Sequence, residues 1–138
     1  MNRSVALVIS ADLNEIGKVA TALDEAMRAS AFSEEIINEL QLAVEEAIAN
    51  TILHGYCDAP GDVAVGIHVT DGVVEVRIED RATPFDPLTV PEPDRESDLD
   101  ERGIGGLGIY LIRSLVDEVV YRYADGKNIL TLVKRRAP

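Results

Sequence analysis

Residues 63–78 have the sequence VAVGIHVTDGVVEVRI, and this stretch decides the fold class. Apolar residues alternate with other residues over 63–69 and again over 73–78, which is the period of a β-strand with one buried face. Between the two runs, Asp71-Gly72 is a typical two-residue hairpin turn. The stretch therefore predicts two antiparallel strands joined by a tight turn.

The chain on either side of this hairpin predicts a second hairpin, one more strand and three helices. Residues 119–123 and 128–133 alternate in the same way around the turn Asp125-Gly126, and residues 5–9 form a short apolar run. Apolar residues at helical spacing predict helices over 13–29, 34–54 and 109–116. This order of elements describes an α+β fold, a two-layer sandwich in which a mostly antiparallel sheet is covered by helices on one face.

The long helix over 34–54 has signals at both ends. Ser33 is a preferred N-cap residue, and the two acidic residues after it suit a helix N-terminus. Gly55 is placed to end the helix, because glycine is the residue most often found where a helix terminates.

Composition limits the classes of protein to which the chain can belong. With 138 residues, 46% of them apolar, it can bury one substantial core, so a single domain over 1–138 is expected. Thirteen basic residues against 25 acidic residues give a formal charge of -12, which disfavours direct binding to nucleic acid or to an anionic membrane. The apolar run at the N-terminus is too short for a signal peptide or a membrane span, and the lone Cys57 suits a reducing compartment. We therefore expect a soluble, cytoplasmic protein.

Two polar residues stand out on the long helix. Glu46 and Asn50 are four residues apart and therefore share a face of the helix. Their neighbours on that face are small or apolar, Leu42 and Leu53 among them, which is more typical of the floor of a site than of a solvated surface. Because this spacing also arises by chance, the pair alone does not establish a site.

Two further segments have the residues for a binding site. Asp80 stands where the second strand of the first hairpin ends, and a carboxylate there can accept a hydrogen bond from an exocyclic amine, although an ordinary acidic turn explains it as well. The glycine-rich stretch from Gly103 to Gly108 precedes a helix, where free backbone N–H groups and the helix dipole favour phosphate. The proline- and acid-rich residues between them, about 81–105, predict a lid loop, with a plain linker as the alternative.

In this order and on these elements, the three segments resemble the N, G1 and G2 boxes of the GHKL superfamily, the histidine-kinase-like ATPases with the Bergerat ATP-binding fold. The resemblance is closest to the small anti-sigma-factor serine kinases and covers nearly the whole chain. It rests on EAIANTILHGY at 46–56, PFDP at 84–87 and GLGI at 106–109.

The resemblance implies binding of ATP or ADP together with Mg²⁺. Asn50 would hold the metal ion, Glu46 would act as general base toward the attacking hydroxyl, and Asp80 would bind the adenine amine. The other positions implied to contact the nucleotide are Ala82, Arg102, Gly103, Gly105, Gly106, Leu107 and Gly108. One amide oxygen is enough for Mg²⁺, which commonly keeps several waters, and phosphoryl transfer needs a carboxylate beside the nucleophile.

Two positions depart from the family pattern. Ala82 stands where the G1 box usually has glycine, so the backbone there must have a negative φ or accept strain. The last strand offers Asn128 or Thr131 where the family often has a threonine near the adenine, and both remain open. His54 is expected to cap or pack at the helix end, and Arg81 to lie on the surface of the lid or near the phosphates.

The resemblance also implies two protein partners: a sigma factor, which is sequestered, and an anti-anti-sigma (STAS-type) protein, which is phosphorylated on serine. A homodimer is expected by analogy. The alternative is a catalytically inactive, nucleotide-dependent binding module that regulates its partner by docking, and the presence of Glu46 argues against it.

Overall fold

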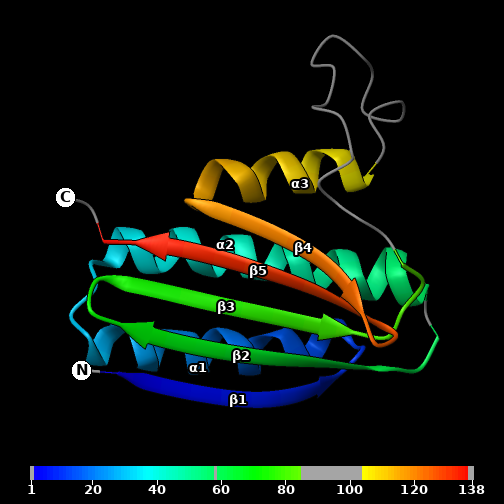
Figure 1. Ribbon diagram of the computed structural model, residues 1–138, viewed down its shortest axis with the longest axis horizontal. Helices are drawn as coiled ribbons and strands as arrows, with labels where there is room; N and C mark the ends of the chain where they lie inside the picture. The colour runs from blue at the N-terminus through cyan, green and yellow to red at the C-terminus, as the bar shows by residue number, and fades with distance from the viewer. Residues whose placement is uncertain (1, 58, 85–103, 137–138) are drawn as a thin grey trace, which may run out of the picture.

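The computed structural model describes residues 2–57, 59–84 and 104–136, the side chains of 104–108 excepted. These residues form a five-stranded sheet in the order β1-β2-β3-β5-β4, in which every pair of neighbours is antiparallel. The strands are β1 (Arg3–Ser10), β2 (Asp62–Thr70), β3 (Val73–Asp80), β4 (Glu118–Ala124) and β5 (Lys127–Arg135). Both predicted hairpins, β2–β3 and β4–β5, are confirmed (Figure 1).

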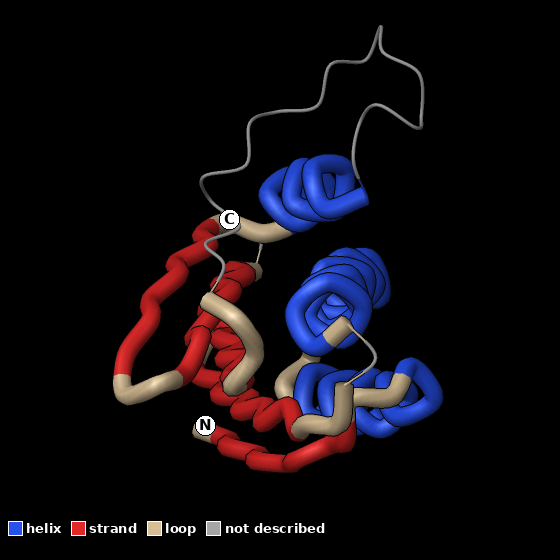
Figure 2. Tube along the Cα trace, turned by 90° about the vertical axis from the view of Figure 1, so that its right-hand side faces the viewer, coloured by secondary structure: helices blue, strands red, loops and turns tan. Residues whose placement is uncertain are grey.

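The helices of the described residues all lie on one side of the sheet (Figure 2). They are the short 3-10 helix η1 (Leu13–Glu15), α1 (Ile16–Ala29), α2 (Glu34–Asn50), the π-helix η2 (Thr51–Tyr56) that continues α2, and α3 (Ile104–Leu115). The predicted α+β sandwich with helices on one face of an antiparallel sheet is therefore confirmed. None of these helices is long and apolar enough to cross a membrane.

The core lies between the sheet and the helices, because each inner strand turns alternate residues toward them. The residues of β2 and β3 that are buried in this way are Val63, Val65, Ile67, Val69, Val74, Val76 and Ile78. The buried stripe of α2, which includes Leu40, Val44 and Ile48, belongs to the same core. Each such side chain contributes about 1.5–3 kcal/mol on burial. The packed core thus fixes the position at which α2 ends relative to the end of β3.

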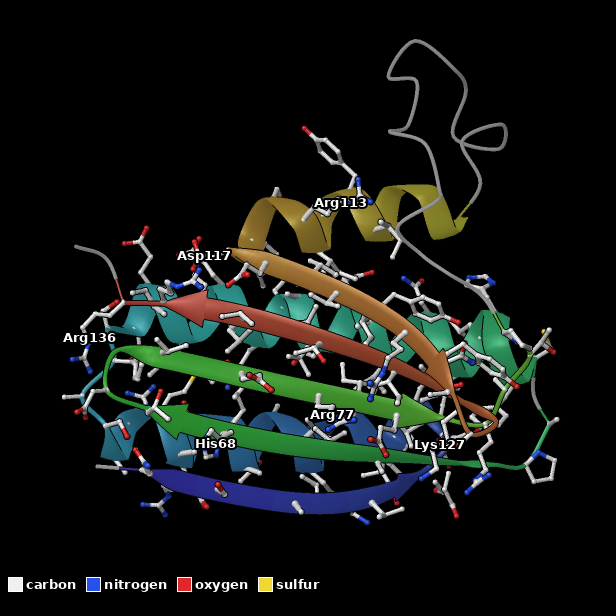
Figure 3. The ribbon with its side chains drawn as sticks, in the orientation of Figure 1. His68, Arg77, Arg113, Asp117, Lys127 and Arg136 are labelled. Atoms are coloured by element: carbon white, nitrogen blue, oxygen red, sulfur yellow. The ribbon has the colours of Figure 1, made fainter. Side chains whose placement is uncertain are left out.

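The opposite face of the sheet carries charged residues. Figure 3 shows Arg77 and Lys127 on this face, and they form salt bridges of 3.1 and 3.9 Å with Glu79. Successive residues of a strand point to opposite faces. Glu79 and Asp80, the last two residues of β3, therefore lie on different sides of the sheet.

The C-terminal end of the long helix differs from the prediction. Gly55 lies inside η2, and the chain leaves the helix at Cys57, whose φ of 52° and ψ of 51° are left-handed. The prediction that Gly55 ends the helix is wrong for a reason of packing: a Cβ added there would lie 3.0 Å from Cβ of Ala82. The N-terminal signal is confirmed, because Oγ of Ser33 accepts the N–H of Ile36 at 3.2 Å.

α3 starts earlier than the sequence indicates. The predicted lid extends to about 105 and the apolar helix starts at 109, whereas α3 begins at Ile104 and takes in the glycines that follow it. A glycine in a helix costs about 1 kcal/mol relative to alanine. Ile109 and Ile112 are buried in the common core and stabilise the helix against this cost.

Candidate functional site

A pocket of about 260 Å³ opens where the end of α2 and η2 meets the end of β3, the start of β5 and α3. These chain ends come together at the right-hand side of Figure 1. The volume lies just below the roughly 300–1,000 Å³ that small-molecule sites span. The lining residues are Ala47, Asn50, Thr51, His54, Gly55, Asp80, Ala82, Thr83, Pro84, Ile109, Tyr121, Asn128 and Leu130. Of the residues predicted for a site, the pocket brings together Asn50, Asp80 and Ala82.

Asp80 is the charged group of this pocket. The alternation that buries Val76 and Ile78 turns the last residue of β3 to the same face, and only 8% of Asp80 is exposed. A buried carboxylate needs donors in place of water. Two donors reach Oδ1: the backbone N–H of Ala82 at 3.0 Å and Nδ2 of Asn128 at 2.9 Å.

The second oxygen of Asp80 is much less engaged. Among the described residues, Oδ2 accepts one hydrogen bond, from the hydroxyl of Thr51 at the long distance of 3.4 Å. Because a carboxylate oxygen can accept two hydrogen bonds, Oδ2 keeps capacity for a donor inside the pocket. The pocket therefore offers a fixed acceptor to an amine group of a ligand.

Asn128 is the other buried polar residue of the described chain, with 7% exposed. It lies directly opposite Asp80 in the β3–β5 register. Its Nδ2 also approaches the carbonyl oxygens of Ala82 and Thr83 at 3.2 and 3.3 Å, and its Oδ1 accepts the hydroxyl of Tyr121. One amide thus joins β3, β4, β5 and the turn that follows β3.

The register also decides between the two residues that the sequence leaves open. Asn128 and Thr131 are three residues apart on β5, so their side chains lie on opposite faces of the sheet. Thr131 is paired with Arg77, which lies on the face without helices. Asn128 lines the pocket and Thr131 does not.

Asn50 faces the pocket from the end of α2. Its Nδ2 is buried and has no hydrogen-bond partner among the described residues. A buried polar group without a partner costs about 1–3 kcal/mol, so a ligand that satisfies it would be favoured. A half-turn about the last side-chain bond brings the amide oxygen to the same place, and oxygen is the ligand atom that Mg²⁺ prefers. Asn50 therefore fits a hard cation or a polar ligand.

Ala82 is accommodated without left-handed backbone. It is absent from the described residues that have a positive φ, as the sequence requires for alanine at this position. The residue is buried, and its methyl group packs against Gly55. The space that a side chain at position 55 would need is taken by the methyl group of Ala82.

A tyrosine clamps the backbone just after Asp80. Oη of Tyr56 donates to the carbonyl of Asp62 at 2.8 Å and accepts the N–H of Arg81 at 2.9 Å. The ring occupies the position that a Cβ of Gly61 would need, so glycine is required just before β2. The clamp ties the turn after β3 to the neighbouring strand.

Glu46 lies one helical turn before Asn50 on α2 and is half-buried, but it does not line the pocket. Of the neighbours expected to form a floor around it, Leu42 and Leu53 are 41% and 43% exposed, whereas Ala43 is buried. The expected floor is therefore wrong for these two leucines, which lie at the surface. Glu46 is therefore one turn away from the pocket.

The remaining predicted residues lie on α3, on the surface or outside the described residues. Gly105, Gly106, Leu107 and Gly108 lie in the first two turns of α3. Arg102 and Gly103 lie outside the described residues. Arg81 is exposed, and His54 is an exposed residue of η2 at the edge of the pocket.

Sequence reasoning missed Thr51 and Tyr121. Thr51 had a signal, because it follows Asn50 directly in the quoted motif and can reach the same region from the helix end. Tyr121 had none, since it is one of several alternating residues of β4, and only the pairing of β4 with β5 brings its hydroxyl to Asn128.

Comparison with known proteins agrees with this geometry. A family model described as the histidine kinase-like ATPase domain matches residues 9–134. The serine-protein kinase RsbW of Listeria innocua is 35% identical over 104 residues, which cover 72% of this chain and 66% of that kinase. The RsbW kinase of Oceanobacillus iheyensis is 30% identical over 109 residues, which cover 75% of this chain and 69% of the relative. The chain thus spans slightly less than two thirds of the length of the Listeria kinase.

One solved structure shares the fold. The RsbU and RsbW domains of a Mycobacterium tuberculosis protein match 99% of this chain and 33% of their own, with a TM-score of 0.70. At 21% sequence identity, this match concerns the arrangement of helices and strands alone.

Proposed function

Because the chain belongs to the histidine kinase-like ATPase domain family, we propose that it is an ATP-dependent serine kinase of the anti-sigma-factor type. Its substrate is a serine of an anti-anti-sigma (STAS-type) protein, and its second partner is a sigma factor that it sequesters. The relatives named serine-protein kinase RsbW support this activity. The observation that carries the proposal is the buried carboxylate of Asp80, whose Oδ2 keeps an acceptor site in the pocket.

This acceptor suits adenine. The exocyclic amine of adenine donates a hydrogen bond, which Oδ2 of Asp80 accepts, while guanine would place a carbonyl oxygen against the carboxylate. Ala47, Ile109 and Leu130 supply apolar surface for the flat ring. The pocket volume of about 260 Å³ suits a base, and in this proposal the ribose and phosphates extend through its opening.

Asn50 and the start of α3 are the elements that face the phosphates. Asn50 would hold Mg²⁺ through its amide oxygen, and the chemistry that the ion would supply there is neutralisation of phosphate charge. The free backbone N–H groups at a helix N-terminus favour phosphate, which assigns this role to Gly105, Gly106, Leu107 and Gly108 of α3, with Arg102 and Gly103 before them. ADP uses the same contacts with one phosphate fewer.

Glu46 is the general base in this proposal. A carboxylate one helical turn from the metal-binding Asn50 is placed to take the proton of a serine hydroxyl that approaches the terminal phosphate from outside the pocket. Glu46 lies outside the pocket lining, which agrees with contact to the protein substrate instead of contact to the adenine ring. The same position would also occur in a binding module that has lost the chemical step, so this candidate is kept as the alternative.

The substitution Glu46→Gln separates the kinase from the binding module. Glutamine keeps the size of the side chain but cannot accept the proton, so single-turnover transfer of labelled γ-phosphate to a purified STAS-type protein should fall about 10²- to 10⁴-fold. Mg-ATP affinity and sigma-factor binding should change little. Glu45→Gln, one residue earlier on α2 and with the same change of charge, is the matched control and should transfer phosphate at the wild-type rate.

Two results would contradict parts of this proposal. If wild-type protein binds Mg-ATP but transfers no phosphate, the chain is the nucleotide-dependent binding module. If Glu46→Gln transfers phosphate at the wild-type rate, another residue is the base. Association of two copies, proposed by analogy, is measured in the same preparation by sedimentation.

A further inference from the structure

The amide of Asn128 is the most heavily used polar side chain of the pocket. Its Nδ2 lies within 3.3 Å of three acceptors: Oδ1 of Asp80, the carbonyl of Ala82 and the carbonyl of Thr83. Its Oδ1 accepts from Tyr121, which fixes the orientation of the amide, because a flipped amide would point its N–H₂ group at the tyrosine and its oxygen at the carboxylate. These partners come from β3, β4 and the turn that follows β3.

This amide determines which oxygen of Asp80 remains for a ligand. Oδ1 receives both Nδ2 of Asn128 and the N–H of Ala82, so the carboxylate cannot rotate without losing two hydrogen bonds. Oδ2 is left toward Thr51 and the pocket. A carboxylate held in this way keeps a fixed orientation, with Oδ2 as the acceptor that remains for a ligand.

We propose that Asn128, oriented by Tyr121, is the positioning residue that makes the pocket selective for adenine over guanine nucleotides. This inference rests on the proposed function, because it assumes that the pocket receives a purine. Asn128 acts through Asp80: it holds the carboxylate in the orientation in which Oδ2 accepts from the adenine amine and repels the carbonyl oxygen of guanine. A carboxylate that is free to rotate would not present an acceptor at this fixed position, so the pocket would distinguish the two bases less well.

An asparagine at position 128 can donate more hydrogen bonds than a threonine could. A hydroxyl has one hydrogen to donate, whereas the amide has two, which allows Asn128 to hold Asp80 and the carbonyl oxygens of the 82–83 turn together. The turn contains Ala82, where the family pattern has glycine. Asn128 therefore connects Asp80, which binds the purine, to the turn at residues 82–83.

The test is the ratio of Mg-ATP to Mg-GTP affinity, measured by calorimetry on the full chain. In Asn128→Ala, we expect ATP affinity to fall about 10- to 100-fold, the range for a lost hydrogen bond to a charged group, and GTP affinity to stay constant or rise. Tyr121→Phe keeps the ring and should shift the ratio in the same direction by about 3- to 10-fold. Asn128→Thr keeps one donor and should restore part of the selectivity. Thr131→Ala, on the same strand but the other face, should leave the ratio unchanged.

The outcomes separate this inference from the proposed function. If Asn128 had only a structural role, Asn128→Ala would weaken ATP and GTP binding equally and would lower the melting temperature in the absence of nucleotide. That result would overturn the inference. An unchanged ratio in both Asn128→Thr and Tyr121→Phe would overturn it even if Asn128→Ala does not fold. Wild-type protein that binds neither nucleotide would instead remove the proposed function, and the inference with it.

Discussion

At the scale of single residues, the chemistry of the pocket depends on the two oxygens of Asp80. Oδ1 is held by Ala82 and Asn128, and within the described part of the chain Oδ2 has only the long contact with Thr51. A carboxylate is an acceptor at both positions, whereas an amide is a donor at one of them. Replacing one carboxylate oxygen of Asp80 by an N–H₂ group therefore tests whether Asp80 binds the adenine amine, with little change in the shape of the side chain.

In Asp80→Asn, the amide oxygen will take the place of Oδ1, because two N–H donors point at that position. The N–H₂ group then takes the place of Oδ2. It faces the adenine amine, and because both groups are donors, no hydrogen bond can form between them. We expect Mg-ATP affinity to fall about 10- to 100-fold, with a small change in the free energy of unfolding. Glu79→Gln is the control, since its side chain forms salt bridges with Arg77 and Lys127 on the other face of the sheet. Equal losses in both variants would show that the effect is not local to the pocket.

At the scale of elements, the pocket depends on how closely η2 approaches the turn after β3. A Cβ at Gly55 would lie 3.0 Å from Cβ of Ala82, closer than side chains normally pack. The tyrosine clamp holds the same two segments together through the N–H of Arg81. The alanine in the turn and the glycine in the helix therefore form a complementary pair.

The pair predicts a specific double-mutant cycle. Gly55→Ala should destabilise the protein by about 1–3 kcal/mol through overpacking, and Ala82→Gly in that background should recover most of the loss. Urea unfolding at equilibrium measures both. Gly17→Ala in α1 is the matched control, because a Cβ there meets nothing within 4 Å, and it should be neutral or stabilise by up to about 1 kcal/mol. Additive effects of the two substitutions would mean that the two residues do not share one space.

The same elements show what the sequence could and could not predict. The hairpins were predictable, because strand alternation and Asp-Gly turns are local signals, and so were Asn50 and Asp80, which stand at element ends within short motifs. The contact between Asp80 and Asn128 was not, since it depends on β5 pairing with β3 across 48 positions of sequence. The end of the long helix was misplaced because Gly55 serves a packing contact that sequence alone does not reveal.

At the scale of the whole molecule, the fold brings three separate parts of the chain to one end of the sheet. The common core holds α2, β3 and β5 in place, and their ends supply Asn50, Asp80 and Asn128 to the same pocket. Two of these carry groups that are costly to bury: the carboxylate of Asp80, and Nδ2 of Asn50, which has no partner among the residues that the structure describes. A ligand that carries an amine at one end and a phosphate-bound cation at the other would satisfy both.

The measurement that tests this account most directly is a calorimetric titration of ATP into the wild-type chain and into Asn50→Ala, each with and without Mg²⁺. We predict binding of one nucleotide per chain that Mg²⁺ strengthens in the wild type, and loss of the Mg²⁺-dependent part in Asn50→Ala, because the metal ion loses its protein ligand. Asn38→Ala, an exposed asparagine of the same helix, should behave as the wild type. No binding to the wild-type chain, or unchanged Mg-ATP affinity in Asn50→Ala, would contradict the account.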